Sequence, residues 1–264
     1  DLHAADGYLN LAALYWLEEG RFRFGASADN DLVFPGALAE RIGDLVVEEG
    51  RVTMHVDEGV LVLIDGKPVR VASLEAVSDG TPGPAQMGSQ FWYVIDRAGQ
   101  VGLRLHDLEN PAIERLPPMP YFEIDPRYRV PARLKRYAEP RQVSVGTVID
   151  GLPYEPESPG VVEFELDGRA FELEAYTSGE RLFFVFGDGT SGRETYGAGR
   201  FLYSQAPGED GLTVLDFNRS YNPPCAFNDF STCPVASPRN RLDVRIEAGE
   251  RYVDALYVGD AIYE

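Results

Sequence analysis

The sequence predicts a mainly β protein of two domains, an N-terminal β-sandwich followed by a C-terminal antiparallel β-barrel or sandwich. Short apolar runs alternate with polar residues at a period of two, as in strands with one buried face. Tight-turn pairs such as Asp65-Gly66 and Asp167-Gly168 separate these runs. The 264 residues, 44% of them hydrophobic, suffice for two folded domains with their own cores.

Hairpins are predicted throughout the first half. Val52, Met54 and Val56 alternate with polar residues before a turn at 57–59, and a second hairpin turns at 97–99. The segment from Tyr8 to Leu17 has apolar residues at helical spacing, but it is short and fits a strand equally well. We therefore expect either a short helix or a strand there.

The clearest hairpin of the second half is "VVEFELDGRAFELEAYT". Its apolar residues alternate with glutamates on both sides of the Asp167-Gly168 turn. One face of this sheet is predicted to be buried and the other heavily acidic. "ERLFFVF" and "GLTVLDF" are predicted as further strands.

A proline-rich stretch from Leu108 to Tyr137 is predicted to connect the two β units. Prolines at 117, 118 and 120 resist regular structure. We place the boundary near residue 122, which gives domains at 1–122 and 123–264.

The net charge of −19 disfavours duplex nucleic acid as a partner, because a polyanion would be repelled. Only two of the 24 basic residues are lysines, and the surface is expected to be acidic. This composition favours a halophilic source; the alternative is a genome whose codon usage favours arginine. No apolar run is long enough to cross a membrane as a helix. The chain starts without methionine, so a leader or tag is expected to have been removed; the compartment stays open, with the cytoplasm favoured.

"FRFGASADNDLVFP" and "RIGDLVVEEGRVTMHVDEGVLVLIDGKPV" give residues 20–106 a pattern that resembles forkhead-associated (FHA) domains. The resemblance implies a β-sandwich whose loops at one end bind phosphothreonine. The family's ligand-binding arginine, serine, histidine and asparagine fall on Ala26, Ala39, Ile42 and Glu58. These side chains offer a phosphate no positive charge, so phosphopeptide binding is not expected and a scaffold or docking role is preferred.

Five further motifs extend over almost the whole chain: "GYLNLAALYWLEEGRFRFG", "RETYGAGRFLY", "DFNRSYNPPCAF", "TCPVASPRNRL" and "IEAGE". In this order they resemble the prokaryotic family catalogued as domain of unknown function 1684 (DUF1684). The resemblance implies a shared fold and no known activity.

The glycine-rich stretch "GDGTSGRETYGAGRFLY" contains Arg193, Glu194, Tyr196 and Arg200. One interpretation is a loop that wraps an anionic or polar ligand, with the arginines as forked donors. The alternative, slightly favoured, is two tight turns with an Arg–Glu pair. The spacing matches no phosphate-binding loop, since the Gly-Lys-Ser/Thr ending is absent.

"DFNRSYNPPCAFNDFSTCP", from Asp216 to Pro234, follows a predicted strand and holds both cysteines of the chain. The favoured interpretation is an irregular loop fixed by prolines, Asn–backbone bonds, and Cys225 and Cys233 as a disulfide or as buried thiols. A second interpretation makes the loop line a pocket with these residues: Asp216, Asn218, Tyr221, Asn222, Cys225, Asn240 and Arg241. A zinc site or a cysteine nucleophile is disfavoured, because no histidine follows residue 106.

Three functions remain open from the sequence. The preferred one is binding of a small polar molecule or peptide in a C-terminal pocket by Arg193, Arg200, Asn218, Tyr221 and Arg241, without cofactor or metal. A hydrolase would use Glu194 and Asp216 as acid–base groups with arginine assistance, which requires the two carboxylates to face each other across one cavity. A docking protein without catalysis would have a solid C-terminal interior and no pocket.

Overall fold

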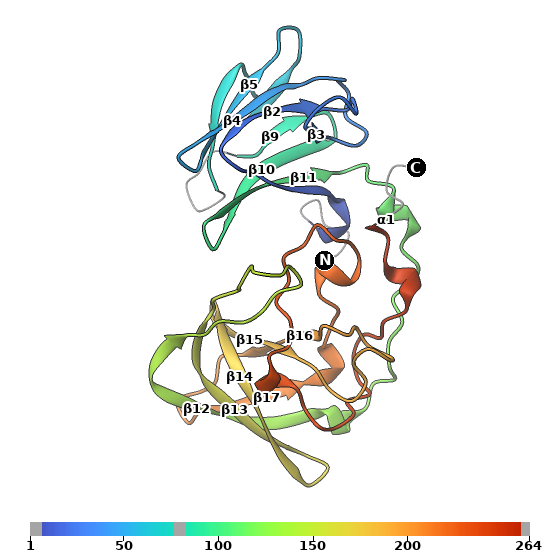
Figure 1. Ribbon diagram of the computed structural model, residues 1–264. Helices are drawn as coiled ribbons and strands as arrows, with labels where there is room; N and C mark the ends of the chain where they lie inside the picture. Colours follow the sequence, from blue (N-terminus) through green and yellow to red (C-terminus); the bar gives the residue numbers. More distant parts are fainter. Residues whose placement is uncertain (1–6, 77–82, 260–264) are drawn as a thin grey trace. The chain divides into compact units, whose positions relative to one another are not determined.

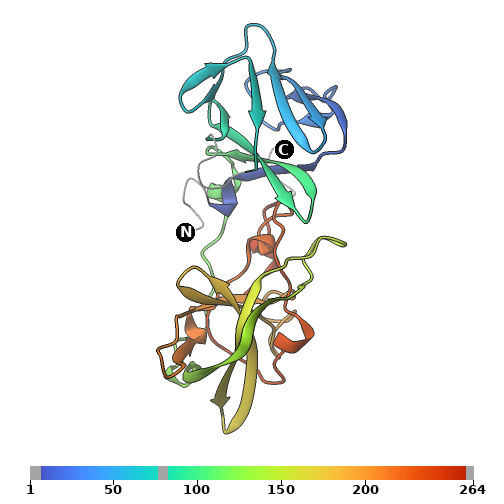
Figure 2. The ribbon, with the colours of Figure 1, turned by 90° about the vertical axis from the view of Figure 1, so that its left-hand side faces the viewer.

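The computed structural model describes residues 7–76 and 83–259, which form two compact units (Figures 1 and 2). Of the described residues, the first unit contains those up to Leu116, together with Asn228–Ser231 and residues 258–259. The second unit contains Pro117–Phe227 and Thr232–Tyr257. Each unit has its own apolar core.

The first unit contains two sheets (Figure 1). One has the order β3-β2-β4-β5-β8, with β2 at Gly20–Gly25, β3 at Leu32–Val33, β4 at Gly43–Glu48, β5 at Arg51–Val56 and β8 at Val71–Leu74. The other has the order β1-β11-β10-β9-β6-β7, with β1 at Leu11–Trp16, β6 at Val62–Ile64, β7 at Lys67–Val69, β9 at Ala85–Met87, β10 at Gln90–Arg97 and β11 at Gln100–Asp107. The predicted hairpins at 65–66 and 97–99 are therefore confirmed.

Side chains from both sheets form the core of this unit. Val52, Met54 and Val56 of β5 are buried, as their alternation predicts. The rings of Phe34 and Trp92 meet edge to face with centroids 5.3 Å apart. This aromatic packing fills the space between the sheets.

The segment 8–17 is a strand and not a helix. A 3₁₀ turn at Tyr8–Asn10 leads into β1, which pairs antiparallel with β11. Buried positions run consecutively through Leu11, Ala12 and Ala13, so sheet pairing overrides the helical spacing.

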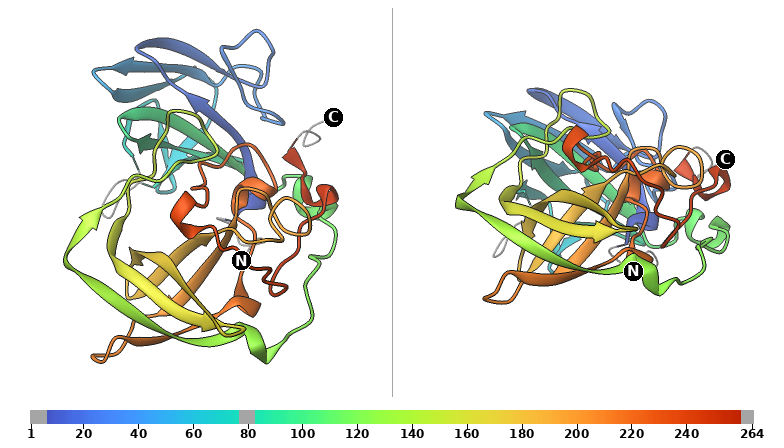
Figure 3. Two further views of the ribbon diagram at one scale, coloured as in Figure 1. Left: turned by 60° about the horizontal axis from the view of Figure 1, so that its bottom comes forward. Right: turned by 90° about the horizontal axis from the view of Figure 1, so that it is seen from below.

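The second unit is built on one antiparallel sheet with the order β16-β15-β14-β13-β12-β17 (Figure 3). Its strands are β12 at Arg129–Gln142, β13 at Glu157–Leu166, β14 at Arg169–Ser178, β15 at Arg181–Phe186, β16 at Arg200–Gln205 and β17 at Leu212–Asp216. The two edge strands approach each other, since Thr213 Oγ1 in β17 donates to the Gln205 carbonyl in β16 at 2.9 Å. The sheet is thus a nearly closed barrel, and the predicted mainly β class is confirmed.

The barrel interior is filled by apolar side chains. Val162 and Phe164 of β13 and Leu173 of β14 point into it, as the alternation predicts. Asp167 and Gly168 both have positive φ, 52° and 73°, and form the predicted two-residue turn.

The outer face of this hairpin is acidic over only part of its length. Glu165 and Glu172 are exposed, but Glu174 is only 7% exposed and Tyr176 is 1% exposed. A second apolar cluster, which includes Val145, Phe183 and Cys225 and to which Tyr176 belongs, covers this end of the sheet. The predicted acidic face is therefore covered at this end, because the irregular segments after β12 and β17 fold over it.

The connection between the units is shorter than the proline-rich stretch predicts. A short helix α1 at Ala112–Arg115 precedes the prolines, and β12 already begins at Arg129. Isolated 3₁₀ turns lie at Pro126–Tyr128, Phe217–Arg219, Pro224–Ala226, Pro238–Asn240 and Asp254–Leu256. Over residues 7–76 and 83–259, no helix has the length and apolar character needed to cross a membrane.

Candidate functional site

The glycine-rich segment between β15 and β16 forms two compact turns. The backbone N–H groups of Arg193 and Glu194 donate to the carbonyl of Thr190 at 3.1 and 2.9 Å. Gly192 has a φ of +76°, which favours glycine, and a Cβ at Gly199 would lie 2.8 Å from the Phe186 carbonyl oxygen. The glycines therefore permit this tight fold.

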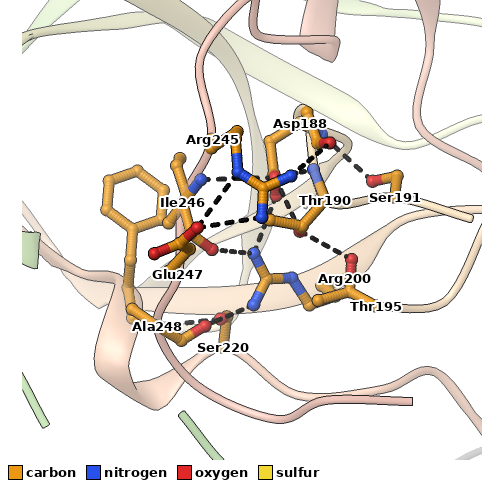
Figure 4. Close-up of polar contacts among 12 residues, drawn as sticks. Asp188, Thr190, Ser191, Thr195, Arg200, Ser220, Arg245, Ile246, Glu247 and Ala248 are labelled. Carbon is orange, nitrogen blue, oxygen red and sulfur yellow. Dashed lines mark hydrogen bonds and ion pairs between the residues drawn. The ribbon is translucent and has the colours of Figure 1, made fainter. Parts of the chain in front are cut away.

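A buried ion pair joins the two ends of this segment (Figure 4). Arg200 Nη2 lies 2.7 Å from Asp188 Oδ2, and both side chains have no exposed surface. Asp188 Oδ1 accepts hydrogen bonds from the backbone N–H and the hydroxyl of Thr190, both at 2.7 Å. The carboxylate is thus fully engaged inside the protein.

The same arginine connects this segment to the "IEAGE" motif at residues 246–250. Arg200 donates to the carbonyl oxygens of Ile246, at 2.9 Å, and Ala248. Burial lowers the pKa of Arg200, and the neighbouring Asp188 opposes this shift. Arg200 therefore has a structural environment and no surface that a ligand could contact.

The outer side of the glycine-rich segment borders a pocket of about 400 Å³, here called the Arg193 pocket. It is lined by Gly192, Arg193, Thr195, Tyr196, Gly197, Tyr252, Val253 and Asp254. The N–H of Tyr252 donates to the Glu194 carbonyl at 2.9 Å, which holds the two lining segments together. The rings of Tyr196 and Tyr252 meet edge to face at a centroid distance of 5.2 Å.

Arg193 is the basic group of this pocket. Its side chain is exposed, and within the described ranges it has no hydrogen bond or ion pair. Arg245 nearby differs, since it lies 2.5 Å from Glu194 Oε2 and 2.8 Å from Glu247 Oε1. Because Glu194 is neutralised in this way, Arg193 can offer its donors to an anion.

The two tyrosines of the pocket are neutral hydroxyl donors at neutral pH. The pKa of Tyr196 is raised mainly by burial, and the nearby Cys225 raises it further. The pKa of Tyr252 is also raised mainly by burial, and the negative charge of Asp254 raises it further. Tyr196 Oη donates to the Cys225 carbonyl at 3.0 Å, and this bond fixes the position of its ring.

The predicted pocket residues of the irregular loop 216–234 do not line this pocket. Asn218 donates to the carbonyl of Asp125 at 3.0 Å and to the carboxylate of Asp216 at 3.1 Å. Tyr221 stacks on Tyr203 at 6.4 Å. Asn222 is buried, and its backbone N–H donates to Glu250 Oε2 at 2.7 Å. These residues hold the loop on the barrel.

Asn240 is a buried cross-link between strands. Its side chain accepts from the Glu174 N–H at 2.8 Å and donates to the carbonyls of Glu174 and Val185 at 3.1 and 3.0 Å. The backbone pairing of β14 with β15 covers Tyr176–Ser178 and does not reach Glu174. The Asn240 side chain therefore provides the hydrogen bonds that the backbones of Glu174 and Val185 do not make to each other. Arg241 is exposed beside Gly187.

The two cysteines are buried thiols in the apolar cluster outside the barrel. The N–H of Cys225 donates to Cys233 Sγ at 3.2 Å. Among the described residues, no group of three or more His, Cys, Asp or Glu side chains is arranged to hold a metal ion.

The hydrolase interpretation requires a cavity shared by Glu194 and Asp216. Glu194 pairs with Arg245, while Asp216 bonds to Asn218 at the end of β17. Neither Glu194 nor Asp216 lines the Arg193 pocket. The docking interpretation fits the solid barrel interior, but the surface carries the Arg193 pocket.

Sequence reasoning did not single out two of the most connected acidic residues. The sequence pattern places Asp188 in a glycine-rich turn and Glu174 on an acidic face. Glu174 accepts from Tyr137 at 2.8 Å and from Ser158 at 3.0 Å. An acidic residue two positions after a buried strand, as Asp188 is after β15, indicates a buried partner.

Comparison with known proteins supports the family resemblance. The model of the family "Protein of unknown function (DUF1684)" matches residues 114–251. The chain is also similar to the uncharacterized protein from gene locus rrnAC0354 of Haloarcula marismortui, whose solution NMR structure is known, with 31% identity over 52% of this chain and 82% of that chain and a TM-score of 0.43. None of the curated proteins matches the chain.

Proposed function

We propose that this chain, which belongs to the DUF1684 family of proteins of unknown function, binds a small polar molecule or peptide that carries an anionic group. The ligand occupies the Arg193 pocket in the second unit. The observation that carries the proposal is an exposed arginine whose side chain has no protein partner in the described part of the chain, beside two tyrosine side chains.

The pocket has the parts of a ligand site. Arg193 supplies forked charge-assisted donors, and the rings of Tyr196 and Tyr252 supply an aromatic wall. Gly192 and Gly197 carry no side chain, so a ligand can approach the backbone closely. The buried Arg200–Asp188 pair fixes the segment that presents these groups.

Asp254 lies on the same rim and favours ligands that are not purely anionic. A molecule with an anionic end near Arg193 and a donor or cation near Asp254 would satisfy both charges. A peptide end or a small amino-carboxylate has this character.

Calorimetric titration with inorganic phosphate and with glycine, at constant ionic strength, tests the proposal. We expect Arg193→Gln to weaken binding about tenfold, the size of one lost charge-assisted bond. Arg241→Gln is the matched control, because Arg241 is an exposed arginine of the same unit that does not line the pocket. Equal loss in both variants, or binding of neither probe to the unmodified protein, would contradict the proposal.

For the first unit we propose an FHA-like sandwich that serves in docking and does not bind phosphothreonine. Its two β-sheets support the likeness. Ile42, at the position of a family ligand group, is fully buried in the core, and Asn30 bonds to the carbonyls of Ser27 and Glu40 at 2.9 and 2.7 Å. We expect no saturable binding of phosphothreonine peptides by fluorescence anisotropy; micromolar binding would refute this.

A further inference from the structure

Cys225 and Cys233 are placed next to each other by different parts of the second unit. The Cys233 carbonyl accepts from the Val148 N–H at 3.0 Å, and the Cys225 carbonyl accepts from Tyr196 Oη at 3.0 Å. Cys233 Sγ nevertheless lies 3.2 Å from the backbone nitrogen of Cys225. A sulfur at that distance needs only side-chain rotation, and no change of fold, to approach the other sulfur.

The thiol pair is connected to the Arg193 pocket through one residue of the pocket wall. Tyr196, which lines the pocket, bonds to the backbone of Cys225. Cys225 is also close enough to contribute to the raised pKa of both Tyr196 and Tyr252. A change at Cys225 therefore has a short path to both aromatic residues of the pocket.

We propose that Cys225 and Cys233 are a reversible redox pair whose oxidation to a disulfide changes the position of Tyr196 and so the affinity of the Arg193 pocket. The effect on affinity rests on the proposed function, whereas disulfide formation and the response of Tyr196 do not. The pair is almost buried, with 7% and 5% of the two residues exposed, so only a small oxidant can react with it.

The oxidant is a small-molecule disulfide such as oxidised glutathione. The thiolate of Cys225, the more exposed residue, attacks one sulfur of the oxidant, which gives a mixed disulfide and releases one thiolate. The thiolate of Cys233 then attacks the sulfur of Cys225, forms the intramolecular bond and releases the second thiolate. The protein loses two electrons and two protons, and the oxidant becomes two thiols.

Oxidation is expected to tighten binding. The disulfide restrains the segment whose carbonyl holds the Tyr196 hydroxyl, so less freedom of this ring is lost when a ligand binds. We expect the affinity for inorganic phosphate to rise at least threefold. Reduction with dithiothreitol should restore the original value.

The first measurement is thiol counting and intact mass on the native protein after incubation with oxidised glutathione. The expected product has lost both thiols and two hydrogen atoms, without an added glutathione. A stable glutathione adduct, or two unreacted thiols that react only after unfolding, would overturn the proposal.

The second measurement follows the aromatic NMR signals of Tyr196, assigned with Tyr196→Phe, and the affinity for phosphate in both redox states. Cys225→Ala/Cys233→Ala is the control, in which neither readout should respond to the oxidant. Unchanged Tyr196 signals after disulfide formation would overturn the coupling. A clear Tyr196 response without phosphate binding in either state would instead refute the proposed function and leave the redox pair supported.

Discussion

Arg193 and Arg200 belong to the same glycine-rich segment and have opposite surroundings. Arg200 has no exposed surface and binds Asp188 and two backbone carbonyls. Arg193 is exposed at the pocket rim, without a partner in the described part of the chain. The difference teaches that one arginine fixes the segment while the other remains available to a ligand, although both have the same chemistry.

The largest effect is expected from breaking the buried pair. Asp188→Asn or Arg200→Leu leaves one buried group without its counter-charge, and the free energy of unfolding should fall by about 3–5 kcal/mol. Urea unfolding followed by circular dichroism measures this loss. Trp16 and Trp92 both lie in the first unit, so their fluorescence is an internal control.

The double variant Asp188→Leu/Arg200→Met sharpens this test. With both charges replaced by apolar groups, much of the lost stability should return. A loss below about 1 kcal/mol in the single variants would mean that the pair is not the anchor of this segment.

The next largest effect is expected at Asn240. Asn240→Ala leaves three buried backbone groups of β14 and β15 without partners, and the loss should be about 2–4 kcal/mol. Asn218→Ala is the matched control, because Asn218 also makes three bonds but is half-exposed, so water can replace them. Equal losses measured by urea unfolding would contradict the buried cross-link.

A smaller, pH-dependent effect is expected at Glu174. Burial alone would raise its pKa, but hydrogen bonds from Tyr137, Ser158 and Arg141 lower it below the usual value. Its stabilisation is therefore present above the unfolded pKa of about 4.3 and disappears as the pH falls through the lowered folded value. Glu174→Gln should reduce stability by about 1–2 kcal/mol at pH 7 and by less near pH 3.

Glu250 serves as a control, because its pKa is shifted in the opposite direction from that of Glu174. Burial raises the pKa of Glu250, despite the Asn222 N–H that opposes the shift. Its contribution is therefore fully present below the unfolded pKa and is lost as the pH rises through the raised folded value. For each variant, the free energy of unfolding is measured against pH and the value of the unmodified protein is subtracted. If this difference changes with pH in the same direction for Glu174→Gln and Glu250→Gln, these assignments are refuted.

The smallest effect on stability is expected at Arg193. Because its side chain is exposed and has no partner among the described residues, Arg193→Gln should change the free energy of unfolding by less than about 0.5 kcal/mol. Urea unfolding of Arg193→Gln, compared with that of Arg200→Leu, measures this change. A loss above about 1 kcal/mol would show that Arg193 has a structural role and would weaken its assignment to a ligand.

The sequence predicted the strands well where alternation and turns agreed. The Asp167-Gly168 hairpin is an example, since two short-range signals specify it. Position 8–17 was ambiguous because a strand buried on both faces loses its period-two pattern. The buried Glu174 was missed because the segment that covers it lies far away in the sequence.

The sequence indicates which segment carries the candidate site, but not which of its residues are buried and which are exposed. Glycines flanked by arginines mark the segment around Arg193, which also contains the candidate Tyr196. Which arginine is buried depends on Asp188, Ile246 and Ala248, and the last two come from a motif about fifty residues later. Tyr252 and Asp254 had no local signal, since their role follows from the pairing of two loops.

The most direct test is an amide NMR titration with inorganic phosphate at constant ionic strength. The predicted result is saturable shifts of the Gly192, Arg193 and Gly197 amides, which disappear in Arg193→Gln and persist in Arg241→Gln. Shifts spread evenly over exposed arginines, or confined to another part of the second unit, would contradict a ligand site at Arg193.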